Sequence, residues 1–211
     1  MREGAMRGWT LMVAMGAGLM PGMGRAEGPA TVGNVEQMVQ VFETVCLQAF
    51  PERRAVDGAM GQLGGTPLAA REVRTYLHDD PGRGWQLVRP EATYVVTIEE
   101  PPYRACAVRR MTPGGFPTRA PFDAAVQRYG AARKRALTPL LSQSMRPPSG
   151  LDIVATVQRV EGGGPGGSTD SLMLFTSDYH GTYDGPFGKD AGKPGIELRY
   201  VHQLRDAGAA P

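Results

Sequence analysis

Two cysteines constrain the fold of this chain more than any other feature. Cys46 and Cys106 stand 60 positions apart and lie in segments of different periodicity. Cys46 belongs to segment 34–50, in which apolar residues recur at steps of three and four, as on the buried side of a helix. Cys106 belongs to segment 103–111, which has the composition of a strand. A fold that pairs the two thiols must pack this helix against this strand.

The first 26 residues have the organisation of a cleavable secretory signal peptide. Basic residues come first, an apolar stretch fills 9–20, and Gly24-Arg25-Ala26 has small residues at its first and third positions. About a dozen apolar residues are too few to cross a hydrocarbon core of roughly 30 Å. We therefore expect cleavage after Ala26. The remaining chain, 27–211, is expected to work in the periplasm or outside the cell as a single domain without a transmembrane segment.

Export would place both cysteines where thiols are commonly oxidised. Their number is even, and the Cys-x-x-Cys spacing typical of redox catalysis does not occur. The best interpretation is a structural disulfide between Cys46 and Cys106. On the chain-entropy model, closing a loop of this length stabilises a fold by roughly 4 kcal/mol.

Hydrophobic periodicity predicts an α+β fold with helices packed on one face of a largely antiparallel sheet of about six strands. Segment 34–50 would be capped by Asn34 and ended by Pro51, and segment 67–78 would open with Thr66-Pro67. The helical patterns lie at 34–50, 52–62, 67–78 and 122–142. The strand patterns lie at 84–89, 93–99, 103–111, 151–160, 170–178 and 195–204, which makes the order ααα-βββ-α-βββ.

Parts of this pattern resemble a group of small uncharacterised exported bacterial proteins. The resemblance covers about 42–110 and rests on Phe-x-x-x-Cys in the first helix, a Gly-Trp strand and an Ala-Cys-Ala-Val strand. In this chain those residues are Phe42, Cys46, Gly84, Trp85, Ala105, Cys106, Ala107 and Val108. The resemblance implies a paired-cysteine α+β fold and brings no activity or functional residues with it.

The chain offers little for catalysis or metal binding. Its histidines are His78, His180 and His202, and none stands in a zinc-binding spacing, so no metal site and no cofactor is predicted. No motif of a nucleophilic serine occurs. His202 lies on the apolar alternation of its strand, so we expect a buried structural residue, opposite Leu172 if the last two strands pair. Asp178 with His180 is the best local pair and supports an alternative hypothesis, a small envelope hydrolase.

Charge is segregated along the chain. Residues 103–148 contain nine Lys and Arg against one acid, Asp123, whereas 27–102 and 149–211 are both acidic. Either the acidic flanks neutralise the basic segment, or one surface of the protein is markedly positive. In the second case the segment would contact anionic envelope polymers or lipid head groups. The residues expected to bind them are Arg109, Arg128, Lys134 and Arg135. Helical spacing within 122–142 predicts that Arg128 and Arg135 lie on one side of that helix, near Lys134.

Removal of the leader changes the overall charge. The full chain has 23 basic and 21 acidic residues, and the leader holds Arg2, Arg7 and Arg25 against Glu3. The processed chain is therefore neutral, which gives no general reason to expect nucleic acid as a partner. The sequence favours a non-catalytic periplasmic or secreted binding protein with a basic face. A hydrolase and a structural subunit of an exported complex stay open as alternatives, because no residue pattern identifies a ligand.

Overall fold

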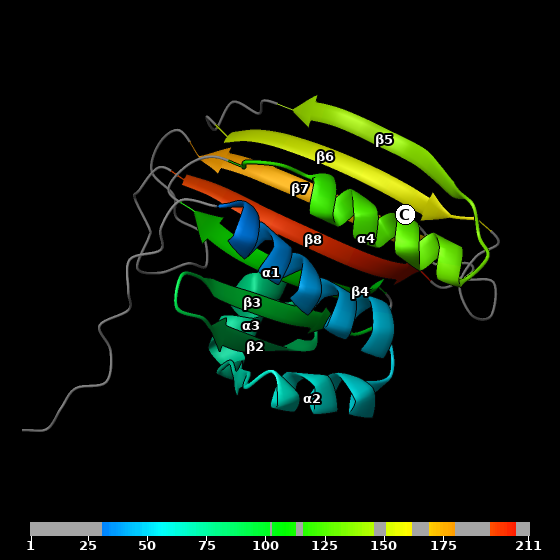
Figure 1. Cartoon of the computed structure of the whole chain (residues 1–211). Helices are drawn as coiled ribbons and strands as arrows, with labels where there is room; N and C mark the ends of the chain where they lie inside the picture. Colours follow the sequence, from blue (N-terminus) through cyan, green and yellow to red (C-terminus); the bar gives the residue numbers. More distant parts are fainter. Residues whose placement is uncertain are drawn as a thin grey trace, which may run out of the picture.

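One antiparallel sheet organises the protein (Figure 1). The structure is a computed structural model that describes residues 31–101, 103–112, 116–145, 151–161, 169–179 and 195–205. Eight strands pair in the order β1-β2-β3-β4-β8-β7-β6-β5. They are β1 (Thr66–Pro67), β2 (Gly82–Val88), β3 (Thr93–Glu99), β4 (Tyr103–Thr112), β5 (Leu137–Met145), β6 (Leu151–Val160), β7 (Thr169–Tyr179) and β8 (Gly195–Arg205). The predicted α+β class is confirmed, with two more strands than the expected six.

Helices cover the sheet, and most of them lie on the same face. They are α1 (Val32–Phe42), which continues as a π-helical segment η1 (Glu43–Ala49), α2 (Arg53–Gln62), α3 (Ala70–Leu77) and α4 (Ala120–Ala132). Helices α1 and α4 run side by side across the strands (Figure 1). Between them and the sheet, the rings of Phe42, Phe122 and Tyr200 meet with centroids 4.8 to 5.8 Å apart. This aromatic cluster is part of the hydrophobic core. We call the side of the sheet that carries α1, α4 and this core the helix-covered face.

Helix α3 is the exception, because it packs on the opposite face of the sheet. Its Leu77 lies so close to Gly82 of β2 that a Cβ on that glycine would be 2.3 Å from Leu77 Cδ1. Leu77 also shares a cavity with Ala105 and Ala107, whose neighbour Cys106 points to the helix-covered face. Successive strand residues point to opposite faces, so Ala105, Ala107 and Leu77 lie on the side of the sheet away from Cys106. We call this side, which α3 covers in part, the second face.

The N-terminus of the first helix differs from the prediction by three residues. Thr31, not Asn34, is the N-cap, with an extended backbone at φ −103° and ψ 164°. Asn34 occupies the third helical position, and its side-chain oxygen accepts a hydrogen bond from the Thr31 backbone N–H at 2.8 Å. The Thr31 hydroxyl accepts in return from the Asn34 N–H at 3.3 Å. This reciprocal capping box explains why the helix starts earlier.

The segment predicted as one helix at 67–78 begins with a strand. Thr66 and Pro67 form β1 and pair with Gln86 and Trp85 of β2, and the helix starts only at Ala70. The predicted cap was therefore wrong. A two-residue edge strand tolerates proline, because an edge position does not require every backbone N–H to join the ladder.

The prediction of a helix over 122–142 was also wrong in its second half. Helix α4 ends at Ala132, and the chain returns as β5, the edge strand. Leu140 and Leu141, which a helix over 122–142 would place on its buried side, are 44% and 39% exposed. Pro139 is the physical reason, because proline within a helix removes a hydrogen bond and clashes with the preceding turn.

Candidate functional site

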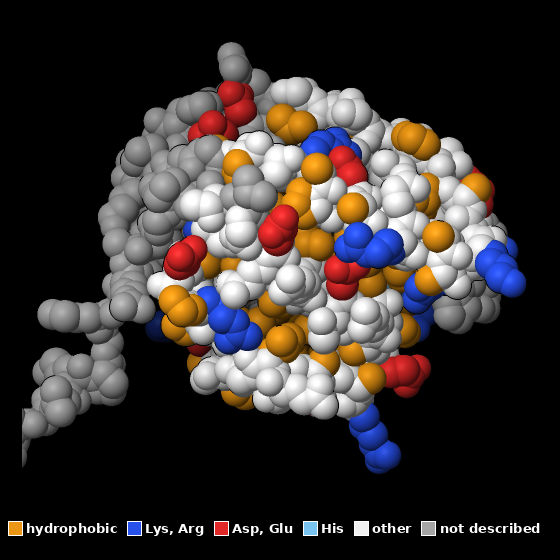
Figure 2. Space-filling view, in the orientation of Figure 1, with side chains coloured by type: hydrophobic (Ala, Val, Ile, Leu, Met, Phe, Trp, Pro, Cys, Tyr) orange, Lys and Arg blue, Asp and Glu red, His pale blue; other side chains and the backbone are white. Residues whose placement is uncertain are grey.

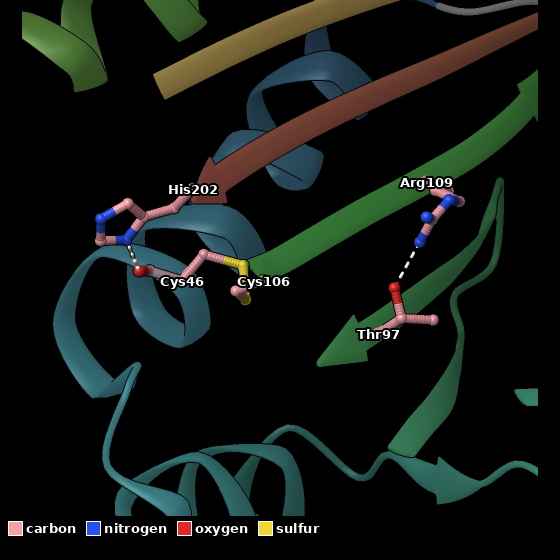
Figure 3. Close-up of a disulfide and its surroundings, with 5 residues drawn as sticks. All are labelled: Cys46, Thr97, Cys106, Arg109 and His202. Carbon is pink, nitrogen blue, oxygen red and sulfur yellow. Dashed lines mark hydrogen bonds between the residues drawn. A yellow bond between two sulfur atoms is a disulfide. The ribbon is translucent and has the colours of Figure 1, made fainter. Parts of the chain in front are cut away.

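Cys46 and Cys106 form the predicted disulfide. Cys46 lies on η1, Cys106 lies on β4, and both side chains are fully buried. Their Cα atoms are 5.3 Å apart, within the ordinary range for a disulfide. The bond ties the first helical layer to the centre of the sheet, next to His202 (Figure 3).

His202 is a buried structural residue, as its place on the apolar alternation predicted, and it pairs with Leu172 as expected. Its Nδ1 lies 2.6 Å from the Cys46 carbonyl oxygen, and its Nε2 lies 2.9 Å from Asp170 Oδ1. A carbonyl oxygen only accepts, so Nδ1 donates to it. The imidazole therefore links the disulfide-bearing helix to β7 through its two nitrogens.

Tyr129 completes this buried network from α4. Its hydroxyl donates to Asp170 Oδ2 at 2.9 Å and lies 3.2 Å from His202 Nε2. Burial and the neighbouring Asp170 carboxylate raise the pKa of Tyr129 well above its ordinary value, so the hydroxyl keeps its proton. Asp170 and His202 are 4% and 1% exposed, so the network is shielded from solvent. The arrangement therefore holds helices to the sheet.

Folding distributes the basic segment 103–148 among three environments. Arg110 is fully buried on the helix-covered face, and Arg109 is buried on the second face. Arg119 forms an ion pair with Asp123 at 2.7 Å, within α4 and its cap. Arg128 forms an ion pair with Glu43 at 2.8 Å across a groove of about 520 Å³ between α1 and α4. Much of the positive charge is thus buried or neutralised.

The third environment is the turn between α4 and β5, which we call the basic turn: Arg133, Lys134 and Arg135. The Arg133 guanidinium lies 3.5 Å from the ring centre of Tyr129 and donates to the Leu47 carbonyl oxygen at 3.3 Å. Lys134 and Arg135 are exposed. Figure 2 shows Lys and Arg side chains projecting at the end of the molecule where α4 leads into β5.

The four predicted binding residues do not share one surface. Arg128 and Arg135 were expected on one side of a continuous helix, but α4 ends at Ala132 and Lys134 takes a left-handed backbone at φ 53°. Only Lys134 and Arg135 remain together. Arg109 lies on the other side of the sheet, because its place in β4 alternates with that of Cys106 and Arg110.

Arg109 occupies an unusual environment on the second face. Its guanidinium donates to the Thr97 hydroxyl (Figure 3), and its Nε lies 3.6 Å from a Glu197 carboxylate oxygen. Burial lowers the pKa of Arg109 to about 10, although Glu197 partly opposes the shift. The side chain therefore stays charged at neutral pH in the wall of a cavity of about 250 Å³. Arg199, which lines the same cavity, was missed because its strand alternation alone marks it as solvent-facing.

The residues of the alternative hydrolase hypothesis are only partly described. Asp178 is half-buried on β7 and stands directly opposite Asp152 of β6. His180 and the leader 1–26 lie outside the described residues. In the described part of the chain, no three or more His, Cys, Asp or Glu side chains gather as a metal site would require. Nor does any described helix have the length and apolar character needed to span a membrane.

Comparison with known proteins gave no match for this chain. No protein-family model, no curated protein and no solved structure matches the chain.

Proposed function

We propose that the protein is an exported, non-catalytic binding protein that docks on an anionic lipid surface through the basic turn and the adjoining edge of the sheet. The proposal rests on one observation: exposed basic residues and exposed apolar residues follow one another along the β5 edge of the sheet. The basic turn leads directly into β5, which has no charged residue and presents Leu140 and Leu141 to solvent.

This combination suits a lipid surface better than a soluble polymer. Basic residues close to an anionic membrane each contribute about 1 kcal/mol, and exposed leucines can enter the boundary between head groups and acyl chains. Glu161 is an acidic residue close to the basic turn, because its backbone N–H donates to the Ala136 carbonyl oxygen at 2.8 Å. Its carboxylate accepts a hydrogen bond from the Thr138 hydroxyl. Arg133 is held by Tyr129 and Leu47, which gives the turn a defined shape.

Export is supported by two independent features. The first 26 residues have the order of a signal peptide, and the disulfide is typical of oxidising compartments. Expression of the full chain with its leader should yield a periplasmic or secreted product that begins at Glu27 and whose cysteines resist alkylation without reductant. Retention of the leader in a cytoplasmic product with two free thiols would contradict export.

Co-sedimentation with vesicles tests the binding surface. The disulfide-bonded protein should sediment with vesicles that contain phosphatidylglycerol, should not sediment with phosphatidylcholine vesicles, and should be released at high salt. The double variant Lys134→Glu/Arg135→Glu should lose binding. The control Arg53→Glu/Arg54→Glu makes the same charge change at exposed residues of α2 and should retain most of it.

Three outcomes would count against the proposal. Equal loss in both double variants would mean that overall charge, not the basic turn, drives the contact. Sedimentation with purified peptidoglycan but not with anionic vesicles would assign the surface to a polymer. Absence of binding to any of these at low salt would leave the basic turn without a membrane role.

A further inference from the structure

We propose that the second face of the sheet binds a small organic anion, of the monocarboxylate class, in the cavity between Arg109 and Arg199. We call this cavity the sheet pocket; it is lined in part by Ala105, Ala107, Arg109, Phe175, Arg199 and Val201. It lies on the other side of the sheet from α1 and α4, and it does not include the basic turn. The proposal is therefore independent of the proposed function.

Strand register places two arginines against each other. Arg109 of β4 is the direct partner of Arg199 of β8, so both side chains leave the sheet on the same face. Like charges in this position repel, and the positive charge of Arg199 helps to lower the pKa of Arg109. Arg109 is also 7% exposed, which removes most of its hydration. An anion between the two guanidinium groups would relieve both penalties.

The intrinsic partners leave donors unused. Arg109 is bonded to Thr97 and faces Glu197, but Arg199 has its guanidinium 4.6 Å from the ring centre of Phe175. The Nε of Arg199 is buried and has no hydrogen-bond partner. Buried donors are normally satisfied, and a carboxylate matches the planar fork of a guanidinium. Because this Nε is shielded from solvent, the proposal does not depend on it; Arg199 lines the pocket, and a ligand carboxylate would pair with the part of its guanidinium that faces the cavity.

Besides its polar residues, the pocket has an apolar part, with small side chains at its base. Ala105 and Ala107 carry only methyl groups, whereas Phe175 and Met173 rise beside them. The volume of about 250 Å³ lies slightly below the usual range of roughly 300–1,000 Å³ for small-molecule sites. These dimensions favour a compact apolar body with one charged end.

Acidic side chains around the pocket limit the charge of the ligand. Glu99 lines the pocket, and burial and the nearby Asp80 raise its pKa. Glu197 faces Arg109. The two arginines and these two glutamates balance in formal charge, so a bound dianion would leave more uncompensated negative charge in the pocket than a monoanion would. This favours a monocarboxylate over a phosphate monoester.

Isothermal titration of the disulfide-bonded protein tests the proposal with defined probes. Benzoate and hexanoate are the carboxylates, and benzamide and hexanamide are neutral matches of similar shape. The carboxylates should bind in the millimolar range or tighter, and the amides should bind at least about tenfold more weakly, because a hydrogen bond between two charged groups is stronger than one to a neutral amide.

Two variants locate the site. Arg199→Gln should weaken carboxylate binding about tenfold or more, and Ala107→Leu should abolish it by filling the floor. Arg159→Gln is the control, because Arg159 is an exposed arginine of β6 outside the pocket. Circular dichroism and unfolding curves verify that each variant is folded.

The proposal is overturned if neither carboxylate binds at millimolar concentration, or if benzamide and hexanamide bind as well as their acids. It is also overturned if folded Arg199→Gln and Ala107→Leu bind like the unmodified protein. Lys134→Glu/Arg135→Glu should retain carboxylate binding, and Arg199→Gln should retain vesicle binding. The failure of one proposal can therefore be told apart from the failure of the other.

Discussion

The two faces of β4 differ in what their buried residues do. On the helix-covered face, Cys106 and Val108 join an aromatic and aliphatic core beneath α1 and α4. On the second face, Ala105, Ala107 and Arg109 surround a cavity, and a second arginine comes from the neighbouring strand. Apolar burial stabilises a fold, whereas buried charge opposes folding unless it is well paired. We infer that the first face holds the protein together and that the second is kept available for a ligand.

Removal of the disulfide should have one of the two largest effects on the free energy of unfolding, together with truncation of Phe42. The double variant Cys46→Ala/Cys106→Ala is expected to lose about 4 kcal/mol, because the bond closes a 60-residue separation on the helix-covered face. Urea unfolding of the oxidised protein and of the variant measures the loss. A decrease below about 1 kcal/mol would mean that the helical layer is held mainly by packing.

A pair of phenylalanine truncations compares the two faces directly. Phe42→Ala should destabilise by about 3–5 kcal/mol, because Phe42 is fully buried against Phe122 and Tyr200. Phe175→Ala on the second face should cost about 1 kcal/mol, because its ring is only partly buried. Chemical denaturation gives both values. Equal losses would contradict the division of roles between the faces.

Two tyrosines of the helix-covered face test the polar network within it. Tyr129→Phe should destabilise by about 1–3 kcal/mol, because it removes the donor to Asp170 Oδ2. Tyr200→Phe is the matched control: its hydroxyl is buried and has no hydrogen-bond partner, so its removal should be neutral or stabilising. Unfolding curves at neutral pH distinguish the two. A similar loss in both variants would show that the removal of a buried hydroxyl as such, not the bond to Asp170, accounts for the effect.

The smallest effect is expected on the second face and depends on pH. Burial, followed by the charge of Asp80, raises the pKa of Glu99 above that of an unfolded glutamate. The proton is therefore held more tightly in the folded state, and its stabilising contribution is lost as pH rises through the folded pKa. When the pH rises from 4 to 7, the free energy of unfolding of Glu99→Gln should increase by up to about 1 kcal/mol relative to that of the unmodified protein.

Urea unfolding at the two pH values measures this gain. Glu91→Gln makes the same chemical change at an exposed residue outside the pocket and serves as the control. A gain that is equal in both variants, or larger at pH 4, would contradict the explanation by burial of Glu99.

Where prediction from the sequence succeeded, local patterns and tertiary structure agree. The strand at 93–99 has the predicted bounds, and His202 stands opposite Leu172 because both follow the two-residue alternation of paired strands. Where it failed, a local signal was outweighed by another in the same segment. Pro139 opposes the helical spacing of the leucines beyond it, and Thr31 competes with Asn34 as the cap.

The candidate site was predicted less well than the fold. Lys134 and Arg135 were chosen as exposed cations, and they are exposed, but their predicted helical alignment with Arg128 does not exist. Arg109 was chosen for its charge and lies in a cavity instead. Its partner Arg199 is 90 positions away in the sequence, and only strand register brings the two arginines together.

The sequence by itself determined the α+β class and the burial of His202, and it indicated the Cys46–Cys106 pairing, because these follow from periodicity and composition. Only the tertiary structure decided which charges are neutralised, which face α3 covers and where a cavity remains. Those outcomes depend on contacts between β4 and β8 and between α1 and α4, which lie far apart in the chain. Local periodicity assigns a residue to one side of its own strand or helix, whereas the element that packs against that side is set by the whole fold.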